Sequence, residues 1–304
     1  MKNRKVLVLL YHRVTKLEYD KNLLAVTQDN FYEQMSYLKK NYPIVRFEQD
    51  WNELDGDAVC ITFDDGYMDN FTNALPILRE LNIPATIFIT TAGINTSEEL
   101  WWDELERILL DRRRKYEKTF SLEDDFFSCE WHTETVADRE ELYDTLHWLM
   151  YDKISVVKRV DWMRQLRDWS KSGNVGRKEN RVMQFNKDMM QSTLLTIGAH
   201  TVNHPSLKNL REQDQRYEIS QSIKDLELLF KRRVTVFSYP FGTQNDYDKL
   251  TIDICKEENI DKAAANIPGL WSSQCDSYQI PRNIVRNWEI NEFIREIEGF
   301  WKLR

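Results

Sequence analysis

Short apolar runs alternate with amphipathic segments through the first third of the chain. The runs Val6–Tyr11, Ala58–Phe63 and Ala85–Ile89 are almost wholly apolar and rich in β-branched and aromatic residues, which predicts strands buried on both faces. Apolar residues at helical spacing predict helices over 31–38 and 73–81. The order strand, helix, strand, helix, strand indicates an α/β fold with parallel strands.

This alternation stops at about residue 97, where a charged, aromatic segment begins that is nearly free of Gly and Pro. Helical patterns start at Trp101, recur over 142–150 and return to the core over 182–190. We expect a helical insertion at about 97–192 rather than a separate second domain, because the strand patterns on both sides fit one sheet. It could be a lid, a substrate platform or an oligomer interface. Its tryptophans are more often core residues than sugar-stacking surfaces; they are Trp101, Trp102, Trp131, Trp148, Trp162 and Trp169.

Strand patterns resume after the insertion. Residues 194–199 and 234–239 are predicted strands with a helix over 217–230 between them. Residues 262–266 and 277–280 are weaker strand candidates. Together with the first three strands, these segments indicate an α/β barrel-like core that spans the chain and is interrupted by the insertion.

Composition narrows the function classes. The chain has 304 residues, 41% of them hydrophobic, and a formal net charge of −8. An acidic chain is a poor match for a phosphate backbone, so no nucleic-acid partner is expected. The N-terminal apolar run Val6–Leu10 is too short for a signal peptide and no run is long enough for a membrane span, so we expect a cytoplasmic protein unless a leader has been removed. Four cysteines without a CxxC pair indicate neither a zinc motif nor a disulfide framework.

Polar side chains that can do chemistry follow the predicted strands. His12 follows the first strand, Asp64 and Asp65 follow the second, and His200 follows the first strand after the insertion. Catalytic groups collect at the carboxyl ends of strands in parallel α/β barrels, so we expect these residues to share one rim. One Asp with His200 and His204 makes a facial ligand set for a divalent metal, and the other Asp is then available as a base for water. This pattern favours a metal-dependent hydrolase.

Each motif also has a simpler interpretation on its own. Asp-Asp-Gly is a common turn, His-x-x-x-His is as often a pair of surface or core imidazoles, and His12 alone could be a core residue. The joint pattern favours a site, since the chain has only five histidines and three of them fall at or just beyond strand ends. The other two, His132 and His147, lie in the insertion and are expected to be structural or surface residues.

With these motifs together, the chain resembles the polysaccharide deacetylases, carbohydrate esterase family 4. The resemblance covers the core on both sides of the insertion and implies a distorted, incomplete (β/α) barrel. The matching segments are Thr62-Phe63-Asp64-Asp65-Gly66-Tyr67, Asn73-x-x-Pro76-x-Leu78, Pro84-Ala85-Thr86-x-Phe88, His200-Thr201-x-x-His204-Pro205 and Tyr239-Pro240-Phe241-Gly242.

The resemblance also implies roles for the site residues. Asp65, His200 and His204 are expected to hold a divalent metal, most often Zn²⁺, with Co²⁺, Ni²⁺ or Mn²⁺ chemically admissible. Asp64 is expected to be the general base for the attacking water. The backbone N–H of Phe241 is expected to stabilise the oxyanion together with the metal. The implied reaction is removal of N-acetyl groups from an N-acetylated sugar or polysaccharide.

Two departures from the family pattern concern the acid and the tether of the base. Many members carry an Arg at the position of Ser238, and many take the general acid from a C-terminal Leu-x-His segment, which is absent here. A branch that resembles the exopolysaccharide deacetylases has an N-terminal Tyr-His-x-Val/Ile segment, which Tyr11-His12-Arg13-Val14 matches. By that resemblance His12 is expected to be the general acid. Arg282 is the candidate tether of Asp64, with a surface position as the alternative.

Two other functions stay open from the sequence. The chain could deacetylate or deformylate a small or lipid-linked sugar precursor, which a cytoplasmic location would favour. It could also be a catalytically inactive carbohydrate-binding protein, which Ser238 and the missing C-terminal His favour and the intact Asp and His set disfavours. The expected partner is a sugar or glycan in each case, and the oligomeric state is not determined by the sequence.

Overall fold

The structure is a computed structural model, and it describes residues 4–303 apart from 126, 186–188 and 190–191. The chain divides into two compact units. The first, called here the barrel unit, comprises Met1–Asn95 and Met183–Arg304. The second, called the insertion unit, comprises Thr96–Val182 and so ends before the predicted limit of about residue 192.

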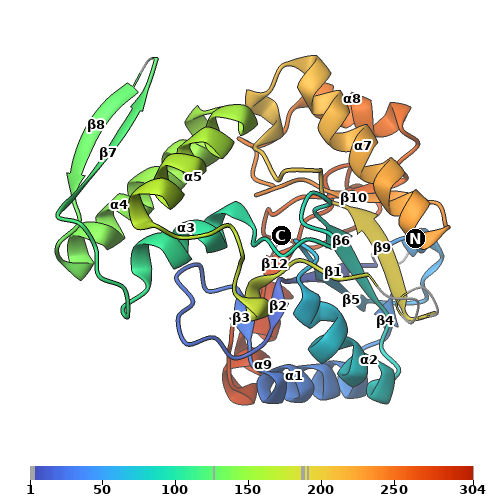
Figure 1. The fold of residues 1–304 in the computed structure, drawn as a ribbon. Coiled ribbons are helices and arrows are strands. Elements are labelled where there is room, and N and C mark those ends of the chain that lie inside the picture. Colours follow the sequence, from blue (N-terminus) through green and yellow to red (C-terminus); the bar gives the residue numbers. More distant parts are fainter. Residues whose placement is uncertain (1–3, 126, 186–188, 190–191, 304) are drawn as a thin grey trace. The chain divides into compact units, whose positions relative to one another are not determined.

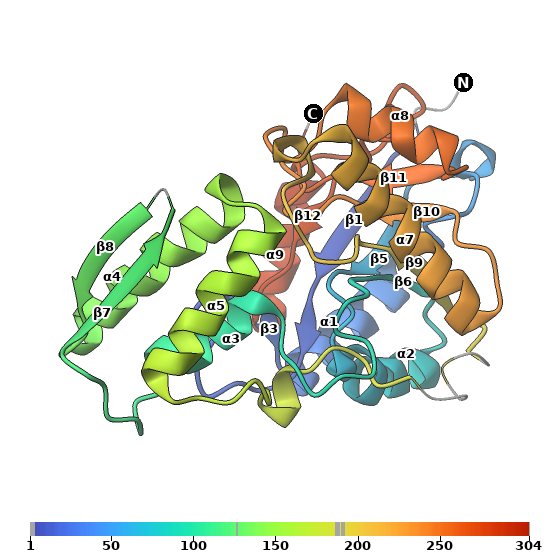
Figure 2. The ribbon, with the colours of Figure 1, turned by 45° about the horizontal axis from the view of Figure 1, so that its top comes forward.

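Eight strands, counted over the described residues, form one parallel sheet in the barrel unit, and this sheet curls into a half-barrel (Figures 1 and 2). The prediction of an incomplete (β/α) barrel is confirmed. The order across the sheet is β11 (Lys262–Ala264), β10 (Val236–Ser238), β9 (Leu195–Ala199), β6 (Ala85–Ile89), β5 (Ala58–Phe63), β1 (Val6–Tyr11) and β12 (Asn283–Ile284), and β4 (Ile44–Val45) also pairs with β5. A separate parallel pair is formed by β2 (Arg13–Val14) and β3 (Ala25–Val26).

The central strands are buried on both faces, which explains why they are continuous apolar runs. On β1, Leu7 and Leu9 belong to the cluster that includes the helix residue Phe31. Val6 and Val8 belong to a second cluster on the opposite face of the sheet. Aromatic rings fill that second cluster through edge contacts; they are Phe47, Trp51, Phe88 and Trp271.

Helices cover the face of the sheet that carries the first cluster (Figure 2). They are α1 (Gln28–Asn41), α2 (Leu75–Leu81), α7 (Glu212–Phe230), α8 (Lys249–Glu257) and α9 (Ile290–Phe300), with the short 3₁₀-helix η5 (Leu207–Asn209). Another short 3₁₀-helix, η1 (Trp51–Glu53), contributes Trp51 to the second cluster. The helix predicted over 73–81 begins as an α-helix only at Leu75, because Asn70–Ala74 form a π-helical turn, η2. In the part of the chain that the structure describes, no helix combines the length and the apolar character needed to cross a membrane.

The insertion unit has its own hydrophobic core, built from α3 (Trp101–Leu110), β7 (Thr119–Asp124), β8 (Phe127–His132), α4 (Val136–Trp148), the π-helical turn η3 (Leu149–Lys153) and α5 (Val156–Ser170), followed by the short η4 (Lys178–Asn180). Helices make up most of this unit, as predicted, but it also contains two strands that were not predicted. The strands β7 and β8 form an antiparallel hairpin. Its signal is the alternation of buried Phe120 and Leu122 with polar neighbours, which is the period of a half-exposed strand.

Most of the tryptophans of the insertion unit contribute to this core. Trp162 belongs to the cluster and is buried, and Trp102 is also buried although it is not part of the cluster. Trp101, Trp131 and Trp169 are partly buried and pack against the core. Trp148 is the exception among these six, with 51% of its surface exposed.

Two weaker predictions for the barrel unit are also wrong. Residues 277–280 form no strand, because Asp276 accepts a hydrogen bond from the backbone N–H of Tyr278 and starts a turn; only a single bridge joins Ile280 to Ala264. Residues 182–185 are not helical, and Met183 instead donates its N–H to the carbonyl of Gly66. Most of the remaining part of that predicted helix lies outside the described residues.

Candidate active site

The Asp-Asp-Gly segment sends its two carboxylates in different directions. The N–H of Asp64 donates to the carbonyl of Tyr11 at 3.0 Å, so Asp64 continues the ladder between β1 and β5 by one residue. Asp65 has a φ of 71° and leaves the strand. Gly66 follows with a φ of +74°, and a Cβ at that position would lie 2.7 Å from Ile89. Adjacent residues can therefore hold different positions in the site.

Arg282 holds the Asp64 carboxylate through two parallel hydrogen bonds, from Nη1 to Oδ1 and from Nη2 to Oδ2, both 2.7 Å long. The guanidinium also donates to the Ser238 hydroxyl at 2.8 Å and to the carbonyl of Ala265 at 2.9 Å. The Ser238 hydroxyl in turn donates to Asp64 at 3.2 Å. Arg282 and Ser238 are completely buried, so this is a desolvated network and not a surface contact.

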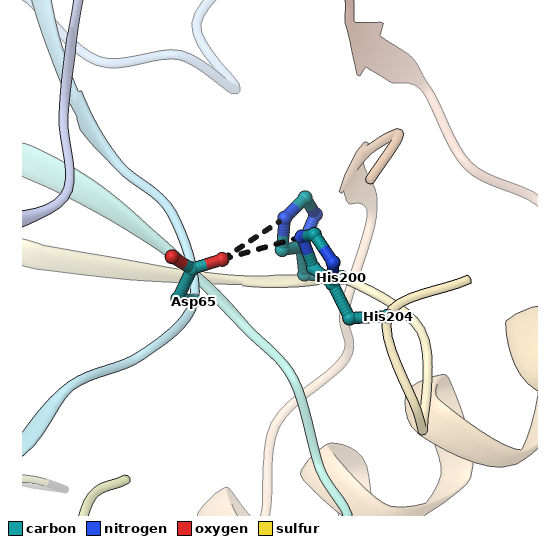
Figure 3. A group of neighbouring side chains, drawn as sticks. All are labelled: Asp65, His200 and His204. Carbon is teal, nitrogen blue, oxygen red and sulfur yellow. Dashed lines mark ion pairs between the residues drawn. The ribbon is translucent and has the colours of Figure 1, made fainter. Parts of the chain in front are cut away.

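Three other side chains converge beside this network (Figure 3). The Nε2 atoms of His200 and His204 lie 3.5 Å and 3.4 Å from the same oxygen, Oδ1 of Asp65. All three residues are buried, and their potential ligand atoms lie within 4.8 Å of one another. The Nε2 atom of His200 is also 3.9 Å from Asp64. The structure therefore brings both carboxylates and both histidines of the two motifs to one place.

This geometry fits a small divalent cation. Ligands placed 2.0–2.1 Å from a tetrahedral Zn²⁺ are separated by about 3.3 Å, close to the observed spacing of the imidazole and carboxylate atoms. The Nδ1 atom of His200 lies 2.7 Å from the carbonyl of Ser238, which can only accept a hydrogen bond. Nδ1 therefore carries a proton, so Nε2, which faces Asp65, is the nitrogen that would bind a metal.

Charge and burial act in opposite senses on the ionisable groups. Burial raises the pKa of Asp64, but the charges of Arg282 and His200 outweigh it, and the pKa is lowered from its ordinary value. Burial lowers the pKa of His200, yet the two carboxylates raise it by more. Asp64 is thus held as a carboxylate, the form that can accept a proton.

Left-handed backbone conformations are concentrated at this site. Asp65, Thr201, His204 and Phe241 all have φ between 53° and 71°, a region that non-glycine residues rarely adopt. Such strain persists only where surrounding contacts impose it, and it is common at functional sites. In the His-x-x-x-His loop, one such contact is the N–H of His204, which donates to the Thr201 hydroxyl at 3.0 Å.

Glu218, on α7, holds the same loop from outside the site. Its carboxylate accepts hydrogen bonds from the N–H groups of Val202 and Asn203, at 2.9 Å and 2.8 Å, and from the side-chain amide of Asn203 at 2.8 Å. The residue is only 3% exposed. Sequence reasoning missed Glu218, because nothing in its helical pattern distinguishes a buried carboxylate that caps a loop from a surface one.

His12 lies beside Asp64 at the strand ends, since Tyr11 and Phe63 are opposite partners in the ladder. The residue is half-buried, and its backbone carbonyl accepts a hydrogen bond from the Asn70 side chain at 2.8 Å. Burial lowers the pKa of the His12 imidazole, the two carboxylates of the site raise it, and the net direction is down. The carboxylates thus lie within electrostatic reach of the imidazole.

Phe241 follows β10 and packs against one of the candidate metal ligands. Its ring and that of His204 are 4.6 Å apart in an edge-to-face arrangement. Phe241 and Gly242 both have positive φ, at 59° and 72°, so the chain turns sharply here. The turn is fixed by a hydrogen bond from the N–H of Asn266 to the carbonyl of Gly242 at 2.8 Å.

Comparison with protein families gives a match to the core of the chain. The family described as polysaccharide deacetylase matches residues 52–138 and 172–261, which together make up more than half of the sequence. The Asp-Asp-Gly and His-x-x-x-His motifs lie within these segments. His12 and Arg282 lie outside them.

Individual relatives are distant. The chain is 21% identical to YxkH of Bacillus subtilis (strain 168) over 289 residues, which cover 92% of this chain and 71% of that protein. The solved structure of the Streptococcus pyogenes deacetylase PplD in complex with acetate is 18% identical, with a TM-score of 0.58 and coverage of 97% of this chain and 98% of that one. IcaB from Ammonifex degensii is 15% identical, with a TM-score of 0.57 and coverage of 98% and 97%. At these identities the structures show a shared fold.

Proposed function

The chain belongs to the polysaccharide deacetylase family, and from this premise we propose that it removes N-acetyl groups from an N-acetylated sugar or polysaccharide with the help of a divalent metal. One observation carries the proposal. Asp65 converges with His200 and His204, while the adjacent carboxylate of Asp64 is held separately by Arg282. A protein that only binds sugar has no need of both a ligand set and a second buried carboxylate.

Asp65, His200 and His204 are the residues that would hold the metal, and Zn²⁺ suits this donor set best, with Co²⁺, Ni²⁺ and Mn²⁺ as alternatives. When bound, the ion supplies positive charge that favours ionisation of water and stabilises negative charge on the acetamide oxygen. Side chains of the protein accept and donate the protons of the reaction.

Asp64 is the proposed general base, and it takes a proton from the water that attacks the acetamide carbon. Arg282 and Ser238 fix both oxygens of its carboxylate, so the base does not have to reorganise during the reaction. The N–H of Phe241 is the proposed donor to the oxygen that becomes negative. His12, beside Asp64 at the strand ends, is the proposed acid that protonates the nitrogen as the carbon–nitrogen bond breaks.

The substrate class follows from this chemistry. Water adds to an acetamide, so the products are acetate and a free amine on the sugar. The solved structure of PplD contains acetate, which is the product expected here, and this agrees with the proposal. A small or lipid-linked N-acyl sugar would present the same acetamide or formamide group, and the choice between polymer and precursor is left to experiment.

The test is acetate release from three substrates: an N-acetylglucosamine polymer, a short oligomer and the monosaccharide. The protein is stripped of metal with a chelator and then assayed with and without added Zn²⁺. We expect release that depends on the metal, and the preferred substrate length assigns the class. If no substrate yields acetate with Zn²⁺, Co²⁺, Ni²⁺ or Mn²⁺, while the protein still binds a glycan, the enzyme proposal is wrong and a binding function replaces it.

A further inference from the structure

The turn that follows the Asp-Asp-Gly motif forms hydrogen bonds with the segment that carries His12. Asp69 accepts one hydrogen bond from the N–H of Val14 and another from Nε of Arg13, both 2.9 Å long. Asn70 donates from its side-chain amide to the backbone carbonyl of His12 at 2.8 Å. Two residues, more than fifty positions away in the chain, therefore bind each residue of the 12–14 segment.

These contacts are buried. Arg13 is 1% exposed, Asp69 5% and Asn70 0%, and the Arg13 guanidinium lies over the ring of Tyr67 with 4.3 Å between its carbon and the ring centre. A buried ion pair is a costly way to fill a core, since apolar residues of similar size often stabilise a protein as well or better. Its value is in fixing one geometry, which suggests a positional role for this pair.

The backbone of the turn also departs from regular helix. Asn70–Ala74 is a π-helical turn that precedes α2. Such turns are rare and occur often at functional sites, because they redirect side chains that an α-helix would place elsewhere. A second side chain of this turn, Asn73, donates to the carbonyl of Val14 at 2.8 Å. The π-helical turn and the residue before it thus present three side chains to one short segment.

The opposite side of the segment is held by backbone pairing. The N–H of Arg13 donates to the carbonyl of Leu24 at 3.2 Å, and the N–H of Thr15 donates to the carbonyl of Val26 at 2.9 Å. The segment is therefore fixed on two sides. The Asn70 contact is to the main chain of His12, so any effect on chemistry must act through the imidazole of that residue.

We propose that Asp69 and Asn70 are positioning residues that fix the His12 imidazole relative to Asp64. The inference rests on the proposed function, in which His12 is the proton donor. The segment that follows β5 carries the base, Asp64, and also Asp69 and Asn70, which place the acid. One segment of chain therefore sets the positions of both proposed catalytic groups.

A double-mutant cycle tests this. Asn70→Ala should lower kcat for an N-acetylated oligomer about 10- to 100-fold, the cost typical of a misplaced catalytic group, with KM changed by less than about threefold. In a His12→Ala background the same substitution should cost less than about twofold, because no imidazole is left to place. The matched control is Asn41→Ala, which removes an amide-to-carbonyl hydrogen bond of the same kind, to Tyr37, and should leave kcat unchanged.

The role of Asp69 is tested by changing it together with its ion-pair partner, so that no buried charge is left unpaired. The double variant Arg13→Gln with Asp69→Asn keeps a polar pair of similar size, and it should lower kcat in the wild-type background but not in the His12→Ala background. An equal loss in both backgrounds would mean that these residues only stabilise the fold, and the proposal would be overturned.

A second readout does not depend on activity. In protein labelled with ¹⁵N-histidine, the His12 ring signals are identified by their loss in His12→Ala, and we expect Asn70→Ala to shift them. Unchanged ring signals would overturn the proposal even if the protein is not a deacetylase. If the wild type is active and His12→Ala keeps full turnover, His12 is not the acid, and the positioning role is overturned with it. If the wild type releases no acetate while the signals shift, the positioning stands and only the proposed function is lost.

Discussion

Arg282 and Asp64 lie 218 positions apart in the chain and form a bidentate ion pair with both hydrogen bonds at 2.7 Å. Ser238, at the position where the family resemblance leads one to expect an arginine, binds both partners through its hydroxyl. A short side chain on β10 leaves space for a guanidinium that arrives from the neighbourhood of β12. The absence of an arginine at position 238 and the presence of Arg282 beside Asp64 therefore belong to one arrangement.

Arg282→Ala is expected to lower kcat at least 100-fold, because it leaves the Asp64 carboxylate buried and without its partner. Stability should also fall, by about 3–5 kcal/mol, the usual cost of breaking a buried pair from one side. Arg282→Lys should be intermediate, since a lysine cannot form two parallel hydrogen bonds. Acetate release and urea unfolding measure the two effects.

The matched control for this prediction is Arg295→Ala, which removes an exposed arginine from the same unit and should change neither quantity. Turnover of Arg282→Ala within a few-fold of the wild type would show that the ion pair does not orient the base.

His12→Ala should matter only when the leaving group needs a proton. For an N-acetylated sugar, whose leaving group is an amine, we expect kcat to fall about 10²- to 10⁴-fold. For 4-nitrophenyl acetate, whose leaving phenolate is stable without protonation, the loss should be less than about threefold. His132→Ala, at an exposed position of the insertion unit, is the control. Equal losses on both substrates would remove His12 from the acid role.

Glu218→Gln should weaken metal binding through the loop that carries the two histidines. Its carboxylate accepts three hydrogen bonds from Val202 and Asn203, inside the His-x-x-x-His loop, and an amide cannot accept them all as well. Outer contacts of this kind typically change metal affinity about 10- to 100-fold. The Kd for Zn²⁺, measured by competition with a chromophoric chelator, is the readout.

Glu212→Gln, on the exposed face of the same helix, should bind Zn²⁺ like the wild type. If Glu218→Gln also keeps the wild-type Kd, the loop does not need this carboxylate to hold its two histidines in place.

The stability of the protein should fall in acid partly through His147. Burial lowers the pKa of this imidazole to about 4, whereas it is about 6.5 in an unfolded chain. The unfolded state therefore takes up a proton first, so the contribution is fully present above about pH 6.5 and is lost as the pH falls toward 4. The ring lies 5.0 Å from that of Trp101, so His147→Phe can keep this packing and remove the titration.

We expect the free energy of unfolding to drop between pH 7.5 and 5 by roughly 1 kcal/mol more in the wild type than in His147→Phe, a figure reduced for the partial exposure of the ring. Urea unfolding followed by tryptophan fluorescence at the two pH values gives both numbers. Identical drops would mean that the imidazole is hydrated in the folded protein.

The order of strands and helices could be predicted because buried parallel strands are continuous apolar runs, as in Val6–Tyr11 and Ala58–Phe63. The same order places the candidate site residues at one rim. The hairpin of the insertion unit was not predicted, because its strands are half-exposed and sit among residues that also fit helices. β12 was not predicted, since a strand of only two residues leaves too short a pattern to recognise.

The contacts that side chains make over long distances in the sequence were the least predictable part of the site. The family resemblance named Arg282 as the candidate tether of Asp64, but a surface position stayed open, because the contact depends on the curl of the sheet, which brings β12 next to β1. Glu218 and Asn70 hold loops that lie 16 and 58 positions away in the sequence, and no local sequence pattern indicates these contacts. The left-handed backbone of Asp65 and His204 is likewise set by tertiary contacts, because a residue with a Cβ seldom adopts this conformation.

The most direct test of the whole account is acetate release by Asp64→Asn protein that has been shown to carry metal. Asparagine keeps the size of the side chain but cannot take a proton from water, whereas Asp65, His200 and His204 are untouched. The account predicts Zn²⁺ content equal to that of the wild type and turnover lower by about 10²- to 10⁴-fold. Turnover within tenfold of the wild type in the metal-loaded variant would contradict it.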